Sequence, residues 1–262
     1  MRIFWESLRE RQRSILAWMI GFIAFCGLLI AFFNEFPDLS FYDEIIAQAP
    51  EIFSALVGEL TTLTTIEGFL SAELFSLMFP VMMAVLGISL ATSLIAKEEN
   101  AGTLELLLAR PVSRAKIFNQ KMLSLVFQLA LMMLACWASI VLFTSIYNVE
   151  INAVNLAWAL VALYLLTLDF SMLAFALSNI FNRGIGMAIS GALFVVSYFV
   201  SNLSAFISSL DKIKDFSFFT YYRHYDLLTN GANYADLLVL LVPILVFYWL
   251  AQAAFERRDI GL

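Results

Sequence analysis

Six long apolar runs dominate the pattern of hydrophobic and polar positions along the chain. They extend over Ile15–Phe33, Leu74–Ala96, Met122–Ile146, Leu156–Ile180, Gly184–Phe206 and Leu237–Phe255. An α-helix rises about 1.5 Å per residue, so about twenty residues cross a hydrocarbon core of about 30 Å. The runs are continuous, whereas barrel strands alternate between apolar and polar positions. The pattern predicts an all-α, polytopic membrane protein with six transmembrane helices in a single domain, residues 1–262.

Composition agrees with burial in a bilayer. Hydrophobic residues make up 62% of the chain and charged residues 14%, and the mean hydropathy is +0.87. Soluble domains carry about 25% charged residues, so a single water-excluding core could not bury this much apolar surface. The first run follows three arginines, but it is longer than a signal-peptide core and no small-residue cleavage site follows it. We therefore expect it to remain as a span.

The basic residues predict the orientation. Lys and Arg accumulate in cytoplasmic loops, whereas Asp and Glu contribute little to orientation. With the six predicted spans, twelve of the 15 basic residues fall on one side, which places both termini in the cytoplasm. The acidic residues of the first outer loop, 35–67, have no Lys or Arg among them. The net charge of −6 is therefore a feature of the outer side and gives no reason to expect nucleic acid.

No pattern of metal-binding or redox residues is present. Cys26 and Cys136 both lie inside apolar runs, where a thiol behaves as a small hydrophobic group. The single histidine, His224, lacks the Cys or His neighbours of a metal site and is expected to form a local hydrogen bond. We expect no metal and no cofactor in this chain.

The cytoplasmic segment 97–121, KEENAGTLELLLARPVSRAKIFNQK, departs most from the rest of the chain. Leu104, Leu107 and Leu108 form a narrow apolar stripe on a predicted helix near Thr103–Ala109. Ser113 suits the N-cap of the following helix, which runs into the third span. The stripe must be buried, and from the residues alone it could dock a partner protein or pack at the membrane interface.

This segment resembles the cytoplasmic signature of ABC-2-type permeases, the membrane subunits of ATP-binding-cassette exporters with the six-helix type V (ABCG-like) fold. The matching elements are Glu98-Glu99, Gly102-Thr103-Leu104-Glu105 and Arg110-Pro111-Val112-Ser113-Arg114. The resemblance covers most of the chain, including a basic N-terminal helix, the six spans and the terminal Phe255-Glu256-Arg257-Arg258-Asp259. It implies that the segment contains a coupling helix that docks on an ATPase subunit.

The resemblance implies a set of ATPase-coupling residues: Glu98, Glu99, Gly102, Thr103, Leu104, Glu105, Leu107, Leu108, Arg110, Pro111, Ser113 and Arg114. No G-x-x-x-x-G-K-[ST] phosphate loop occurs in the chain, so we expect no catalysis by this chain. ATP and Mg would be held by two separate ATPase subunits. A second permease copy or a paralogue would complete the pathway in the plasma (inner) membrane of a prokaryote.

Segments outside the spans also show helical patterns. Residues 1–13 are basic and amphipathic, which predicts an interfacial helix. We expect short outer helices before span 2, from the apolar spacing within 45–60, and before span 6. The aromatic residues of 211–236 fit either a belt in the headgroup layer or a re-entrant cap. Small residues on spans 2 and 5, such as Gly87 and Gly191, permit close helix packing within the subunit or across a dimer.

One carboxyl group lies inside a predicted span. Asp169 falls near the centre of the fourth run, where a lipid-facing charge costs about 3 kcal/mol or more. We expect it to face a polar interior, with Ser171 or Gln128 as a neighbour. Asp169 and Gln128 could line a pathway for a polar or cationic substrate, or Asp169 could be a structural hydrogen-bonding group.

Two further functions fit parts of the pattern. A non-transporting membrane partner of an ATPase, in immunity or sensing, would use the same coupling segment. An intramembrane protease of the Glu-Glu-x-x-x-Arg type fits poorly, because Gly102 and Thr103 occupy the region where its arginine belongs and the chain has one histidine. Whether the chain is an exporter subunit or a non-transporting partner of an ATPase, its spans would contact membrane lipid.

Overall fold

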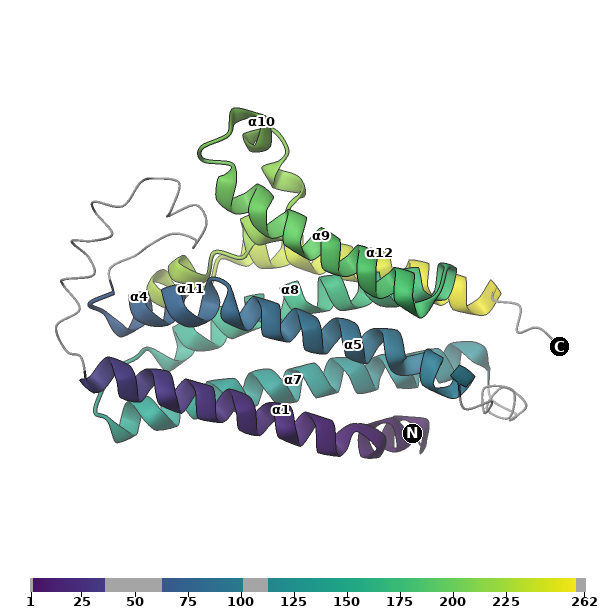
Figure 1. The fold of residues 1–262 in the computed structure, drawn as a ribbon, viewed down its shortest axis with the longest axis horizontal. Coiled ribbons are helices and arrows are strands. Elements are labelled where there is room, and N and C mark those ends of the chain that lie inside the picture. Colours follow the sequence, from purple (N-terminus) through teal and green to yellow (C-terminus); the bar gives the residue numbers. More distant parts are fainter. Residues whose placement is uncertain (1, 36–62, 101–112, 258–262) are drawn as a thin grey trace.

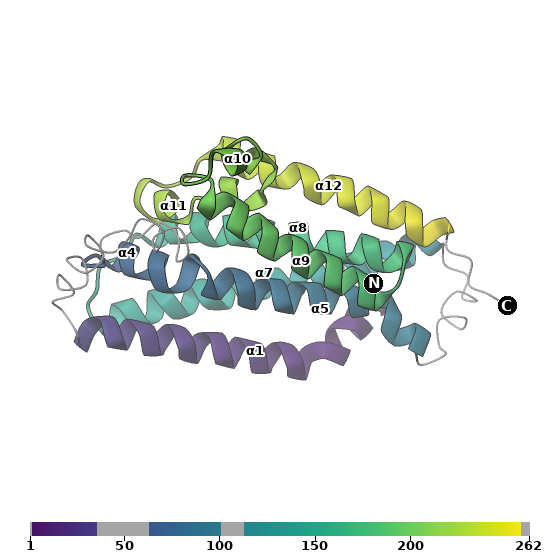
Figure 2. The ribbon, with the colours of Figure 1, turned by 45° about the horizontal axis from the view of Figure 1, so that its top comes forward.

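The computed structural model describes residues 2–35, 63–100 and 113–257, and this part of the chain is helical without strands (Figure 1). The long helices are α1 (Arg2–Glu35), α5 (Met78–Asn100), α7 (Arg114–Ile146), α8 (Ala153–Ile180), α9 (Arg183–Leu203) and α12 (Tyr234–Arg257). They form an elongated bundle. α1 begins and α12 ends at the same end, here called the termini end, and the opposite end is called the distal end (Figures 1 and 2).

Five helices are long and apolar enough to cross a membrane, and a bent pair of helices makes a sixth candidate. The third predicted span begins earlier than its apolar run, because α7 continues back to Arg114 and is capped by Ser113. Its Oγ accepts a hydrogen bond from the Lys116 amide at 3.4 Å, which is the N-cap expected from the sequence. The predicted interfacial helix, 1–13, is continuous with the first span in α1.

The second span is broken. It comprises α4 (Ile66–Leu70), the π-helical turn η1 (Ser71–Phe75) and α5, and the two parts meet at an angle of 41°. The Ser76 amide donates to the Ser71 carbonyl oxygen at 2.8 Å, which is the i→i+5 bond of a π-turn. The run predicted as Leu74–Ala96 therefore begins earlier and bends, because an extra residue in one turn interrupts the α-helical ladder. The outer helices expected within 45–60 lie outside the described residues.

Helix α8 is the centre of the bundle and packs against α5, α7, α9 and α12. It is closely approached by α5, where a Cβ atom at Gly87 would overlap the Oγ of Ser171, and by α9, where a Cβ at Gly186 would overlap the Oγ of Ser178. At Gly191 on α9, by contrast, a Cβ would meet nothing within 4 Å. Gly87 therefore serves packing within the subunit, which is the first of the two roles expected for the small residues.

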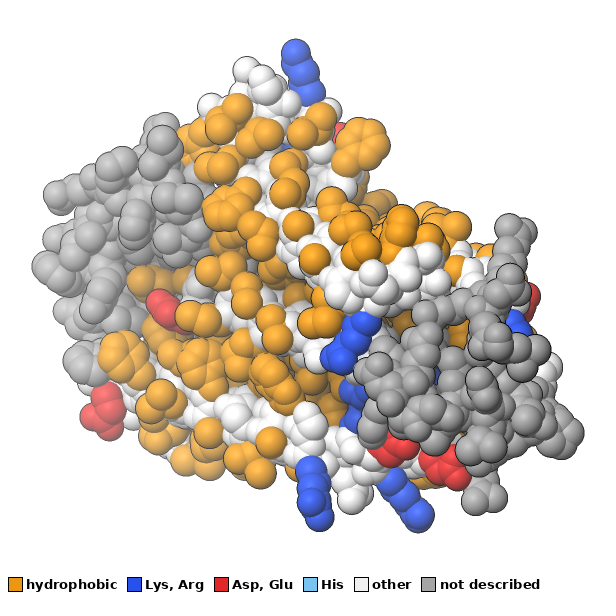
Figure 3. Space-filling view, turned by 45° about the vertical axis from the view of Figure 1, so that its right-hand side comes forward, with side chains coloured by type: hydrophobic (Ala, Val, Ile, Leu, Met, Phe, Trp, Pro, Cys, Tyr) orange, Lys and Arg blue, Asp and Glu red, His pale blue; other side chains and the backbone are white. Residues whose placement is uncertain are grey.

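Apolar side chains cover the flanks of the bundle, and the Lys and Arg side chains visible in Figure 3 lie mostly toward the termini end. The exposed large side chains lie on every long helix and include Ile20, Val85, Leu134 and Trp249. A protein in water rarely exposes contiguous apolar patches of this extent. Together with the five or six spanning helices, this surface identifies an integral membrane protein.

Between α9 and α12 the chain folds back over the distal end as α10 (Ser208–Asp211), η2 (Lys214–Phe216), η3 (Phe218–Tyr221) and α11 (His224–Asn230). Most of the aromatic rings in this segment do not form a belt in the headgroup layer, which was one of the two arrangements expected from the sequence. The Phe218 ring lies 5.4 Å from that of Phe170 on α8, and Phe219 lies 5.2 Å from Phe194 on α9. Only Phe216 among these phenylalanines is strongly exposed, at 85%. The aromatic residues anchor this segment in the bundle core.

Candidate functional site

The termini end is the candidate coupling site, because the segment predicted to dock a partner joins α5 to α7 there. Lys121 of α7 is 3% exposed and its Nζ donates to the Leu94 carbonyl oxygen of α5 at 2.7 Å. Burying an ammonium group without partners is costly, so this contact holds the two helices in one register. The bond therefore joins the two helices, α5 and α7, that flank the predicted coupling segment.

Helix α1 joins the same site. The Arg11 guanidinium donates to the Ser93 Oγ of α5 at 2.5 Å. Ser93 in turn donates to the Ser89 carbonyl oxygen one turn earlier. The N-terminal amphipathic turns of α1 also contact α7, where the Phe4 ring lies 5.8 Å from the Phe127 ring. The N-terminal part of α1 is thus fixed to both helices that carry the predicted coupling segment.

Helix α12 provides the third attachment. The Arg114 side chain donates to the Glu256 carbonyl oxygen at 3.2 Å, and the Tyr248 hydroxyl donates to the Asn119 Oδ1 at 2.6 Å. Behind these polar contacts the Phe118 ring packs 5.9 Å from Phe255. Ser113 and Arg114, two of the residues assigned to coupling, therefore sit at a helix start that is anchored to the last span.

The remaining coupling residues cannot be placed. Glu98 and Glu99 lie in the last turns of α5, but their side chains are outside the described part. The other residues lie wholly outside the described residues: Gly102, Thr103, Leu104, Glu105, Leu107, Leu108, Arg110 and Pro111. Their role stays a prediction.

The interior carboxyl group is fully buried. Asp169 is 0% exposed, and neither of its carboxyl oxygens has a hydrogen-bond partner among the residues that the structure describes. The Gln128 Oε1 is likewise buried without a partner. Ser171, which was expected as a neighbour, does not bond to Asp169; its Oγ donates to the Thr167 carbonyl oxygen at 2.6 Å, one turn back on the same helix. Asn179 and Ser190 also carry a buried side-chain oxygen without a partner, so Asp169 and Gln128 are two of four such residues in the described parts of the spans.

Sequence reasoning missed the attachments that Lys121 and Arg11 make. From the sequence, Lys121 was expected only as a positive charge of the cytoplasmic side, and Arg11 also as part of the amphipathic segment 1–13. The sequence contained one signal for Lys121, since it directly precedes the apolar run of α7 while the polar residues Ser124 and Gln128 follow one and two turns later. No comparable signal pointed to Ser93 as the acceptor for Arg11.

A family model for an ABC-2 family transporter protein matches residues 1–260. The chain belongs to the ABC-2 transporter family. This membership confirms the resemblance carried by segment 98–114, and it makes the chain a membrane component of transport rather than a catalytic subunit. No curated protein matches the chain. Permeases of the ABC-2 family generally work with ABC ATPase subunits.

Proposed function

We propose that the chain is the permease subunit of an ATP-binding-cassette exporter and that two separate ATPase subunits drive it. Membership of the ABC-2 transporter family over residues 1–260 is the observation that carries this proposal. The spans would form part of the substrate pathway, and a second copy or a paralogue would form the rest. Both termini would lie in the cytoplasm of a prokaryote, and ATP and Mg would bind only to the partner subunits.

Segment 98–114 would transmit the motion of the ATPase subunits. A docked segment can move the spans only if its ends are firmly attached to them, since a loose connection would absorb the displacement. Here the Lys121–Leu94 bond ties the two flanking helices at 2.7 Å, and the Arg11–Ser93 bond ties α1 to the same place at 2.5 Å. A displacement of the segment would therefore move α1, α5 and α7 together.

The docking surface would be the leucine stripe, with Glu105 and Arg110 as its charged borders. Burying an apolar stripe against a partner is favourable by about 25 cal/mol per Å². The charges would fix the orientation of the helix in its groove more than they add affinity.

The interior would contribute Asp169 and Gln128 to the pathway. Both carry buried oxygen atoms without hydrogen-bond partners, and such groups are costly unless a partner is supplied. A polar or cationic substrate, or a proton, would supply that partner during transport. A structural role for Asp169 would require a hydrogen bond that neither Ser171 nor Gln128 provides.

The test is the permease-dependent ATP hydrolysis of the complex assembled with its ATPase subunit in lipid vesicles. We expect Leu107→Pro and Glu105→Arg to lower this stimulation at least about fivefold, since proline would break the docked helix and the charge reversal would remove the contact that orients it. Ser208→Ala, at the distal end, is the matched control and should leave it unchanged. Full stimulation in both coupling variants would contradict the proposal, as would a chain that transports without any ATPase.

A further inference from the structure

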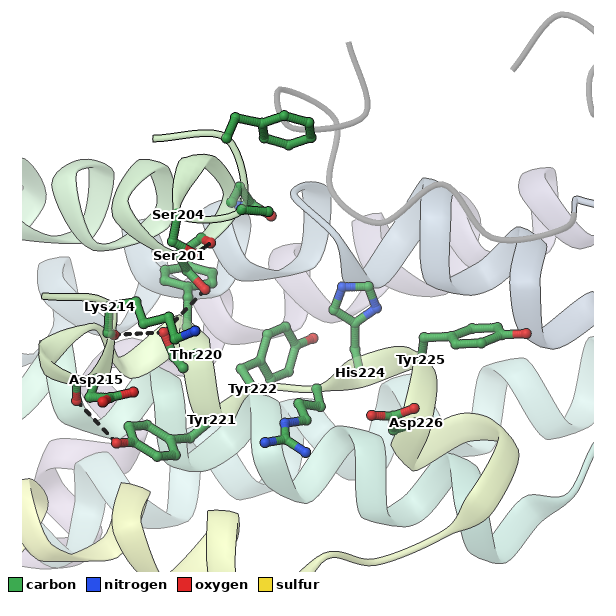
Figure 4. Close-up of a pocket in the computed structure, with 15 residues that line it drawn as sticks. Ser201, Ser204, Lys214, Asp215, Thr220, Tyr221, Tyr222, His224, Tyr225 and Asp226 are labelled. Atoms are coloured by element: carbon green, nitrogen blue, oxygen red, sulfur yellow. Dashed lines mark hydrogen bonds between the residues drawn. The ribbon is translucent and has the colours of Figure 1, made fainter. Parts of the chain in front are cut away.

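A cavity of about 620 Å³ lies at the distal end, away from the candidate coupling site. Its walls come from the end of α9, from η2 and η3, and from the start of α11 (Figure 4). The lining combines aromatic rings with hydroxyl, amide and carboxylate groups. Tyr221, Tyr222 and Tyr225 contribute rings, and Asn202 and Asp226 are among the polar residues.

The walls are held in place by contacts to two spans and by a hydrogen bond within the cavity segment. The Asn155 Nδ2 of α8 donates to the carbonyl oxygens of Leu228 and Thr229 at 3.2 and 3.1 Å, which fixes the last turn of α11. At its other end α11 is fixed by His224, whose Nδ1 lies 2.8 Å from the Ser71 Oγ. The Thr220 Oγ1 donates to the Lys214 carbonyl oxygen at 2.7 Å. These hydrogen bonds fix the positions of the residues that line the cavity.

The two cations that line the cavity are each paired with an acid outside the lining. The Lys214 Nζ lies 2.6 Å from an Asp211 carboxylate oxygen. This hydrogen bond raises the pKa of Lys214, so the lysine stays charged and bound to its partner. The Arg223 Nε lies 3.4 Å from an Asp236 carboxylate oxygen. Neither cation therefore offers an unpaired positive charge to a ligand.

The Asp226 carboxylate makes no ion pair with any residue that the structure describes. It lies on the Tyr225 and His224 side of the cavity in Figure 4. Desolvation lowers the pKa of His224 to about 4, so the imidazole is neutral at neutral pH and adds no positive charge here. The side chain of Asp226 is exposed and available for contact.

The tyrosines complete an environment suited to a cation. Tyr225 lines the cavity and is partly exposed, so its ring can contact a ligand, whereas Tyr222 is 3% exposed and its buried hydroxyl has no partner among the described residues. Burial also raises the pKa of this phenol, so it remains neutral. Aromatic faces attract ammonium groups, by about 0.5–2 kcal/mol each. A carboxylate beside such rings provides both the charge and the surface that an organic ammonium ion needs.

We propose that this distal cavity binds an organic cation, with its ammonium group beside Asp226 and the ring of Tyr225. A metal ion fits less well, because no cluster of three His, Cys, Asp or Glu side chains in the described ranges could hold one. The site does not depend on the proposed ATPase coupling.

The experiment measures binding to the purified full-length chain in lipid nanodiscs, without any ATPase subunit. The probes are choline and its uncharged isostere 3,3-dimethylbutan-1-ol, which have nearly the same shape. We expect choline to bind at least about tenfold more tightly, and Asp226→Asn to remove most of that difference. Tyr225→Leu should weaken choline binding without affecting the neutral probe.

Glu35→Gln is the matched control, because it removes a carboxylate at the distal end of α1, outside the cavity. It should leave choline binding unchanged. Equal binding of the two probes, or no choline binding up to about 100 mM, would overturn the proposal. A loss in Glu35→Gln as large as that in Asp226→Asn would also overturn it, since it would indicate general attraction to a negative surface. Competition by Na⁺ or Ca²⁺ at equal charge concentration would indicate an inorganic cation instead and would likewise overturn it.

Discussion

The Nδ1 of His224 lies 2.8 Å from the Oγ of Ser71, and this contact joins two parts of the chain that are 153 residues apart. Ser71 begins the π-turn in the second span, and His224 begins α11. The histidine was expected from sequence to form a local hydrogen bond. Its partner is remote in sequence, so the bond connects the folded-back distal segment to the bend of a span.

Removing the hydroxyl of this pair should loosen α11. We expect Ser71→Ala to lower the stability of the protein by about 1 kcal/mol, the usual net value of a hydrogen bond that is partly shielded from water. Ser208→Ala on α10 is the control, because its side chain is exposed. Thermal unfolding in detergent measures both variants. A melting temperature of Ser71→Ala equal to that of the parent would show that the contact contributes nothing.

His224 should make the distal segment sensitive to acid. Desolvation lowers its pKa to about 4 in the folded protein, whereas an unfolded histidine titrates near 6.5. The unfolded state therefore binds more protons between about pH 6.5 and 4, and stability falls as the pH decreases through this range. Because His224 is only partly buried, we expect a loss of about 1–2 kcal/mol by pH 4.5.

The measurement for this pH effect is the melting temperature at pH 7 and at pH 4.5. The variant His224→Gln cannot gain a proton in this range, so its curve isolates the contribution of the imidazole. The difference between parent and variant should grow on acidification. A constant difference over this range would contradict the assignment.

The contact of α5 with α8 should not tolerate a side chain at position 87. A Cβ atom there would overlap the Ser171 Oγ and approach the Thr167 Cγ2 to 3.0 Å. We expect Gly87→Val to cost about 1–3 kcal/mol, as overpacking of a filled interior does. Gly191→Val is the control, because a Cβ there meets nothing within 4 Å. Similar melting temperatures for the two variants would contradict the close approach.

Asp169 should show opposite effects on stability and activity. Its buried oxygens lack partners, so Asp169→Leu removes a desolvated group and should leave stability unchanged or raise it by about 1–3 kcal/mol. The same variant should abolish transport if the carboxyl group contacts the substrate or a proton. Asp169→Asn, which keeps the shape and a polar group, should retain membrane abundance. Unchanged transport at equal abundance would exclude the pathway role.

The long apolar runs predicted the spans well, because the bilayer requires continuous apolar helices of a minimum length. Ser113 was also predictable, since N-capping depends on its own side chain and the amides one turn ahead. The bend at Ser71 was not predictable, because nothing in the local periodicity marks an extra residue in a turn. The inward packing of Phe218 and Phe219 depends on rings from α8 and α9 that are distant in sequence.

The chemistry of the candidate coupling site stays a prediction, and its geometry was predictable only in part. The segment 98–114 carries a family signature in consecutive residues, which one sequence can reveal. The hydrogen bonds that attach the flanking helices, by contrast, join residues that are distant in the sequence. Lys121 reaches a main-chain oxygen, and any residue type can offer such an acceptor, so no side chain in the sequence identifies the partner.

The π-turn of the second span has a consequence for how the sequence can change. A turn of this kind holds one residue more than a turn of α-helix, so deleting a single residue from Ser71–Phe75 would restore a regular helix. The upstream residues of α4 would then rotate by about 100° about the helix axis, and their buried face would turn away from the bundle. Substitutions in this turn can be accommodated one by one, whereas its length is fixed by the packing on both sides.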